Sequence, residues 1–180
     1  MVVEPVAGAQ RALIEREHER GEGGALISYD PNIRPTVEPS LAIWRDTLAW
    51  MLPRTHLLKI REEDVGLLFP GAALAELATA WLAQGPRLVV ITRGGQGALG
   101  FTTSTQVQAA PMQVEVIDTV GAGDTFQAGL LSWLWRHDML GADGLHRLDS
   151  APLAQALRFA ARAAAITCSR RGGDLPRLAE

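Results

Sequence analysis

The chain has 180 residues, 47% apolar and 21% charged, a composition typical of a globular protein with a buried core. A formal net charge of −3 and a single lysine, Lys59, argue against a nucleic-acid binder, because phosphate backbones need several cations on one face. One cysteine, Cys168, excludes an intrachain disulfide. The sequence has neither a signal-peptide start nor a run of about eighteen apolar residues, so we expect a cytoplasmic protein that does not span a membrane.

Hydrophobic periodicity predicts alternating helices and strands along most of the chain. In chain order we expect a helix over residues 6–20, a strand over 25–29, a helix over 40–51 capped by Ser40, a strand over 55–60, a short helix over 61–68, a helix over 71–84, a strand over 87–92, a β-prone segment over 101–108, a strand over 114–117, a helix over 125–135, a loop over 137–150 and a helix over 151–168. Such alternation is typical of an α/β fold with a mostly parallel sheet.

A glycine motif follows the apolar strand at residues 87–92. Residues 95–100 match the G-x-G-x-x-G pattern of dinucleotide-binding proteins, and Asp118 lies near the distance expected for a ribose-binding carboxylate. That function requires a helix to begin at the glycines, whereas residues 101–108 are β-prone and poor in helix formers. A hairpin is therefore favoured over an NAD site, with the NAD enzyme kept as an alternative.

A run of small residues precedes the helix expected at residues 125–135. The strand predicted at residues 114–117 ends just before it, so Gly121, Ala122 and Gly123 fall at a helix N-terminus. The first amide N–H groups of a helix have no intrahelical partner, and the helix dipole is positive there. Small residues that let a ligand touch this backbone create a site for a phosphate or a developing oxyanion.

Asp124 occupies the first turn of the same predicted helix. The helix dipole favours its charged form, so the carboxylate can accept a proton and is a candidate general base. The alternative is structural: Asp118 or Thr119 caps the helix, and Asp124 is one of the acidic residues common in first turns.

Residues 118–131 read Asp-Thr-Val-Gly-Ala-Gly-Asp-Thr-Phe followed by Gln-Ala-Gly-Leu-Leu, which resembles the C-terminal signature of the ribokinase/PfkB family of carbohydrate kinases. The resemblance implies a ribokinase-like, three-layer α/β/α fold. It also implies transfer of the ATP γ-phosphoryl group to a sugar hydroxyl, most like a fructokinase. By the same resemblance, the amides of Gly121, Ala122 and Gly123 form the anion hole, and Asp124 takes the proton from the sugar hydroxyl.

Further motifs resemble the nucleotide site of that family. They are Asp-Pro-Asn-Ile-Arg after the strand at residues 25–29, a glycine loop after residues 87–92 and a small-residue helix at residues 151–168. The resemblance implies nucleotide contacts from Thr92, Gly94, Gly97, Asn32, Arg34 and Ala161. The tail at residues 169–176 resembles the chain end of bacterial fructokinases and could line the nucleotide pocket. The alternatives are an Asp-Pro turn with an exposed arginine and a plain hairpin turn.

Metal ions are implied at two carboxylates. Related kinases carry an Asn or Ser and, three residues on, a Glu that order Mg²⁺ around the phosphates, where this chain has Arg61 and Asp64. Asp64 offers a hard oxygen ligand for Mg²⁺, but Arg61 cannot ligate a cation. Asp118 is the predicted ligand of a monovalent cation such as K⁺. Charged residues at a helix start explain Arg61 and Asp64 equally well without a metal.

The resemblance covers the C-terminal part of the family only. We therefore expect residues 1–180 to form a single partial domain, without the N-terminal half and lid that carry most sugar-binding residues. Such a cut leaves an open sheet edge, which a second copy or a partner chain could cover. Two functions follow: the ATP- and sugar-binding catalytic part of a kinase, with weak or no activity alone, or a non-catalytic remnant that acts as a nucleotide-binding interaction module.

Overall fold

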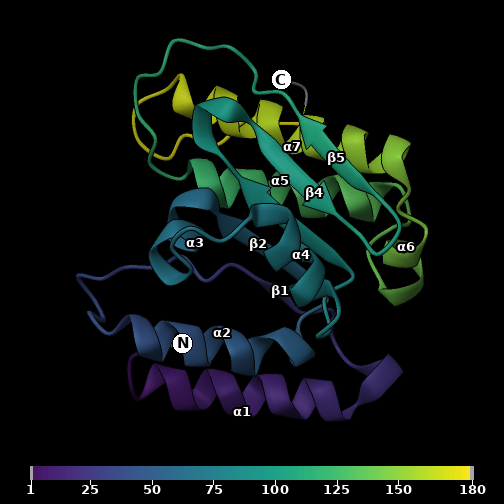
Figure 1. The fold of residues 1–180 in the computed structure, drawn as a ribbon. Helices are drawn as coiled ribbons and strands as arrows, with labels where there is room; N and C mark the ends of the chain where they lie inside the picture. Colours follow the sequence, from purple (N-terminus) through teal and green to yellow (C-terminus); the bar gives the residue numbers. More distant parts are fainter. Residues whose placement is uncertain (1, 179–180) are drawn as a thin grey trace. The chain divides into compact units, whose positions relative to one another are not determined.

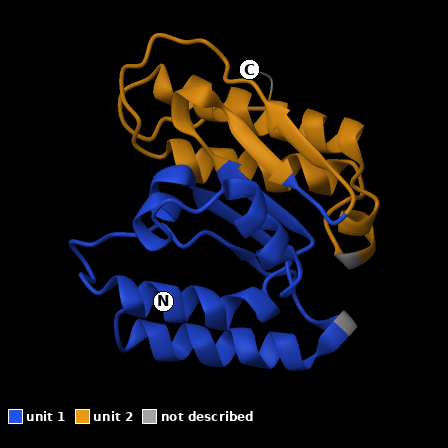
Figure 2. Cartoon of the chain, viewed as in Figure 1, with its two compact units in different colours: residues 1–91, 101–103 blue, residues 92–100, 104–180 orange. Residues whose placement is uncertain are grey.

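The computed structural model describes residues 2–178, which form two compact units (Figure 2). Unit 1 comprises residues 1–91 and 101–103, and unit 2 comprises residues 92–100 and 104–180. The strand order in the sheet is the sequence order, from β1 to β5. The predicted α/β class is confirmed: the sheet is mixed and mostly parallel, and helices flank it.

Unit 1 alternates helices and parallel strands. It contains α1 (Val6–Glu19), β1 (Ser28–Tyr29), α2 (Leu41–Met51), β2 (Leu57–Arg61), α3 (Glu62–Leu68), α4 (Leu74–Leu82) and β3 (Leu88–Thr92), with 3₁₀ turns at Gly21–Gly23 and Leu52–Arg54. β1 pairs with β2 in parallel, with Ser28 opposite Leu57. The carbonyl of His56, just before β2, accepts the N–H groups of Arg87 and Leu88 at the start of β3, so these two strands also run the same way.

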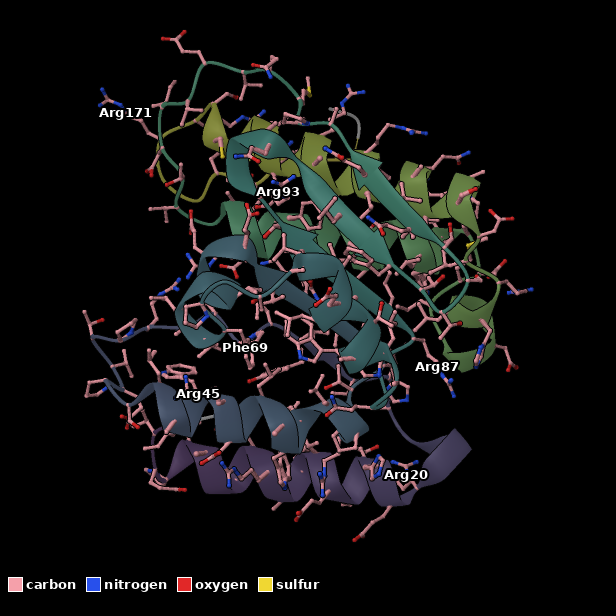
Figure 3. The ribbon with its side chains drawn as sticks, in the orientation of Figure 1. Arg20, Arg45, Phe69, Arg87, Arg93 and Arg171 are labelled. Atoms are coloured by element: carbon pink, nitrogen blue, oxygen red, sulfur yellow. The ribbon has the colours of Figure 1, made fainter. Side chains whose placement is uncertain are left out.

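The core of unit 1 lies around its strands. The first four residues of β2 and of β3 are all buried, which is typical of parallel strands covered on both faces. α1 and α2 lie side by side (Figure 1), and the Arg11 guanidinium of α1 stands 5.4 Å from the centre of the Trp50 ring on α2. Arg45 of α2 donates to the carbonyl of Leu68 at 3.2 Å, which ties α2 to the end of α3 (Figure 3).

Unit 2 contains a hairpin and three helices. Its elements are β4 (Ala98–Phe101), β5 (Gln106–Ala109), α5 (Ala122–Arg136), α6 (Ala142–His146) and α7 (Ser150–Cys168), with a 3₁₀ turn at Gly94–Gln96. α5 packs along α7 (Figure 1), and the approach is close at Gly129, where an added Cβ would lie 3.2 Å from the Cα of Ala160. Small residues on both helices therefore allow the close approach.

Most predicted elements are confirmed, including the Ser40 cap, whose Oγ accepts the N–H of Ile43 at 3.4 Å. Residues 98–109 form the predicted hairpin, so no helix follows the glycine motif and the NAD hypothesis loses its structural requirement. None of the helices in the described part of the chain has the length and apolar character needed to cross a bilayer.

Two predictions of secondary structure are wrong. Residues 114–117 form no strand: Val116 and Ile117 are 62% and 54% exposed, and the N–H of Ile117 donates to the carbonyl of Cys168 at the end of α7 rather than to a strand. The predicted loop at residues 137–150 contains α6, whose Leu145 is buried. Both segments are too short for hydrophobic periodicity to show their secondary structure, which tertiary contacts determine instead.

Candidate functional site

The start of α5 carries the central part of the candidate site. Gly121 precedes the helix with a φ of +78°, a left-handed conformation that favours glycine. The N–H of Ala122 donates to the carbonyl of Thr119 at 3.2 Å, and among the described residues no side chain caps the helix start. The amides of Gly123 and Asp124 lie in the first turn, where a helix offers no carbonyl partner, so they remain able to bind an anion.

Asp124 lies on the exposed side of this first turn, whereas the next residue, Thr125, is buried. The Oγ1 of Thr125 donates to the carbonyl of Gly121 at 2.9 Å and accepts the hydroxyl of Thr167 on α7 at 3.1 Å. Thr125 therefore fixes the start of α5 against α7. An exposed carboxylate beside free amides can take a proton from a hydroxyl bound near the same amides.

Asp118 joins the loop before α5 to the C-terminal tail. Its Oδ1 accepts the N–H of Val120 at 3.0 Å, and its Oδ2 accepts the N–H of Gly172 at 2.9 Å. These backbone donors, Val120 first, hold the pKa of Asp118 below its usual value. The tail thus passes beside the start of α5, and an added Cβ on Gly121 would lie 3.8 Å from the Cα of Gly173. Arg171 points away from the ribbon (Figure 3).

The predicted nucleotide contacts of the glycine loop lie in a tight turn between β3 and β4. The N–H of Arg93 donates to the carbonyl of Gly97 at 2.8 Å. A Cβ at Gly97, whose φ is +88°, would collide with the carbonyl oxygen of Ala109, so the fold itself requires this glycine. Gly94, with a φ of +52°, has open space where a Cβ would stand. Thr92 ends β3 in the same unit, and Ala161 is a half-buried residue of α7.

The motif after β1 forms a turn held by a buried lysine. Asn32 has a φ of +48°, and its N–H donates to the Oδ1 of Asp30 at 3.3 Å. The Nζ of Lys59, whose side chain is 1% exposed, donates to the Oδ2 of the same carboxylate at 2.6 Å. Arg34 is exposed and donates to the carbonyl of Ile33 at 2.9 Å. Asn32 and Arg34 therefore lie on a turn that Lys59 and Asp30 hold in place.

Sequence reasoning did not assign a role to Lys59. The signal available was a lone charged residue inside the apolar strand at residues 55–60, and such a residue needs a counter-ion when buried. Its partner, Asp30, lies 29 residues away in the chain, and the pair forms only because β1 and β2 are parallel neighbours whose carboxyl ends meet.

Asp64 does not offer a magnesium ligand in this structure. Its side chain has no exposed surface, and both of its oxygens accept from Arg61: Oδ2 from Nε at 2.9 Å and Oδ1 from an Nη at 2.6 Å. The bonded Asp64 carboxylate raises the pKa of Arg61, so the guanidinium stays charged. The donor set therefore does not fit a bound Mg²⁺ at Asp64.

The predicted site residues are divided between the two units. Asn32, Arg34 and Asp64 belong to unit 1 at the carboxyl ends of β1 and β2. The other group belongs to unit 2: Thr92, Gly94, Gly97, Asp118, Gly121, Ala122, Gly123, Asp124 and Ala161.

Residues 11–179 match the pfkB family of carbohydrate kinases, the family whose motifs are resembled by the start of α5, the turn after β1 and the glycine turn after β3. The chain belongs to that family. It is 35% identical over 158 residues to a fructokinase of Rhizobium leguminosarum bv. trifolii, an alignment that covers 88% of this chain and 46% of the relative.

Solved structures show the same ribokinase-like fold. The fructokinase of Vibrio cholerae O395, with fructose, ADP and calcium ion bound, superposes with a TM-score of 0.77 at 26% identity, covering 96% of this chain and 53% of that one. A double mutant of that fructokinase, with fructose, ADP and potassium ion bound, gives a TM-score of 0.78 at 27% identity, covering 96% and 52%. The chain thus spans about half the length of these relatives.

Proposed function

We propose that this chain is the nucleotide-binding and catalytic part of an ATP-dependent sugar kinase, most like a fructokinase. The observation that carries the proposal is the start of α5: a glycine-led helix with no side-chain cap among the described residues and an exposed carboxylate, Asp124, in its first turn. Membership of the pfkB family suggests phosphoryl transfer, a reaction that needs both a site for an anion and an acceptor for a proton.

In the proposed reaction, a sugar hydroxyl oxygen attacks the γ-phosphorus of ATP. Asp124 accepts the hydroxyl proton, a new oxygen–phosphorus bond forms, and the bond to the β-phosphate oxygen breaks to release ADP. The amides of Gly121, Ala122 and Gly123 are the proposed donors to the transferred phosphoryl group, whose negative charge they stabilise together with the helix dipole. A general base in this role typically contributes about 10²–10⁴-fold in rate.

The nucleotide contacts are part of the same proposal. The proposed contacts are Thr92, Gly94 and Gly97 at the turn, Ala161 on α7, and Asn32 and Arg34 after β1. ATP would arrive as its Mg²⁺ complex, with the metal bound by the phosphates and not by Asp64. Asp118 keeps a second lone pair on each oxygen, which leaves it a proposed ligand for K⁺. A cytoplasmic location is part of the same proposal.

A non-catalytic nucleotide-binding module is the second candidate. One observation favours it: Arg61 occupies the carboxylate of the metal motif. β1 stands at one end of the strand order, and a groove of about 410 Å³ beside it is lined by Leu13 and Ile14 of α1 together with residues 26–31. A second copy or a partner chain is proposed to cover this edge.

Calorimetry with fructose and with Mg-ATP separates the two candidates, because a kinase must bind both and the module needs only the nucleotide. A coupled assay for ADP release should show at most weak fructose-dependent turnover by the chain alone, lowered a further hundredfold or so by Asp124→Asn. Turnover that persists unchanged in Asp124→Asn would remove this carboxylate from the mechanism. Mg-ATP binding without fructose binding or turnover would select the module.

A further inference from the structure

The end of β2 and the start of α3 are joined by a guanidinium–carboxylate pair three residues apart. Arg61 donates through Nε to one oxygen of Asp64 at 2.9 Å and through an Nη to the other at 2.6 Å. Two parallel N–H···O bonds of this kind form the two-pronged geometry in which a planar guanidinium matches a carboxylate. Each Asp64 oxygen is therefore engaged by the same cation.

Because the Asp64 carboxylate is buried, ligands other than Arg61 cannot reach it from solvent. The Asp64 side chain has no exposed surface, while that of its partner Arg61 is 33% exposed. Arg61 also reaches the carbonyl of Ile33 at 3.4 Å and the carboxylate of Glu63 at 3.5 Å. The guanidinium thus bridges the turn after β1 and the first turn of α3, and its removal would leave a buried carboxylate without a counter-ion.

A divalent cation cannot share this carboxylate. Mg²⁺ binds oxygen at about 2.0–2.1 Å and keeps several of its waters, which a carboxylate with no exposed surface cannot accommodate. An arginine offers only donors and repels the ion. In the described part of the chain, no group of three His, Cys, Asp or Glu side chains offers an alternative metal site.

We propose that the guanidinium of Arg61 takes the place of a divalent cation at Asp64, as a built-in counter-ion that leaves this chain with no divalent-metal site at the end of β2. The proposal does not depend on sugar kinase activity, since it concerns the protein without nucleotide. It has a structural consequence: the turn at residues 30–34 and the start of α3 are held together by a side chain of the protein, whatever the metal concentration.

Titration of Mn²⁺ into the nucleotide-free chain tests this proposal, with free Mn²⁺ measured by electron paramagnetic resonance. The wild-type chain and Asp64→Asn should bind equal amounts of Mn²⁺. Arg61→Asn should gain one site, which the double variant Arg61→Asn/Asp64→Asn should lose. Arg61→Lys should gain none, because the ammonium keeps the positive charge beside Asp64.

A wild-type Mn²⁺ site that disappears in Asp64→Asn would overturn the proposal, as would a folded Arg61→Asn chain that gains no site. Circular dichroism establishes which variants fold. If Arg61→Asn unfolds without metal, Mn²⁺ should restore its folding and should leave the melting temperature of the wild type unchanged. If Mn²⁺ fails to restore folding, the comparison of wild type with Asp64→Asn alone decides: equal binding supports the proposal, and loss of binding overturns it.

Discussion

The carboxylate of Asp118 accepts the N–H of Gly172 at 2.9 Å, so the loop before α5 holds the C-terminal tail 54 residues further along the chain. Its other oxygen accepts the N–H of Val120, one residue before the glycine that leads the helix. One side chain thus positions two backbone segments beside the proposed phosphate site. The pKa of Asp118 is lowered, so its carboxylate should stay ionised above pH about 4. The two hydrogen bonds should therefore persist in the folded protein above that pH.

Asp118→Ala should release the tail. Without the carboxylate, the N–H of Gly172 loses its acceptor, and amide hydrogen exchange at residues 170–175 should speed up while that of α7 stays slow. Asp174→Ala is the matched control, because the Asp174 side chain is 67% exposed and pairs with Arg170 at 3.5 Å. Equal exchange at Gly172 in the two variants would show that Asp118 does not hold the tail.

Gly97→Ala should destabilise the protein by about 2 kcal/mol or more, because the backbone conformation excludes a side chain and the new Cβ meets the carbonyl of Ala109. The control is Gly95→Ala in the same turn, where a Cβ would have open space and the change should stay within about 0.5 kcal/mol. Urea denaturation measures both. Equal effects would mean that the turn rearranges freely and that Gly97 has no special structural role.

His56 should make stability pH-dependent. Its Nδ1 accepts the N–H of Ile27 at 3.0 Å, which only the unprotonated nitrogen can do, and burial, before the nearby cations, lowers the pKa of His56. The unfolded chain therefore binds the proton first. Stability should be complete above pH about 6.5 and fall as the pH drops from there towards the folded-state pKa.

The pH effect is measured by urea denaturation at several pH values between 7.5 and 5. His56→Gln keeps an acceptor without a titrating group, so it should lose this component of the pH dependence. An identical pH dependence in the variant and the wild type would assign the effect to other groups.

Local patterns predicted the elements and the helix start at Gly121 because the information lies within a few residues of chain. Periodicity located α2, α4 and α7, and β-prone residues after Gly97 favoured a hairpin over a dinucleotide-binding helix. The pattern Gly-Ala-Gly-Asp predicted a helix N-terminus with an acidic first turn, which α5 shows.

Long-range contacts could not be predicted in this way. The pairing of Lys59 with Asp30, and of Asp118 with Gly172, depends on which strands and loops become neighbours, and no local spacing encodes that. The sequence did flag Arg61 as a departure from a metal motif, but only the geometry revealed that it engages both oxygens of Asp64. The strand prediction at residues 114–117 was wrong because Val116 and Ile117 are exposed, which local sequence does not reveal.

Titration calorimetry of Mg-ATP into three chains tests most directly whether the start of α5 binds the phosphates of ATP. Ala122→Asp places a negative charge at the proposed anion site, where it suits the helix dipole and should not unfold α5. Ala128→Asp puts the same charge on an exposed position further along the helix. We predict one Mg-ATP site in the wild type, unchanged in Ala128→Asp and weakened about tenfold or more in Ala122→Asp. No binding to the wild type, or equal binding to all three chains, would contradict the account.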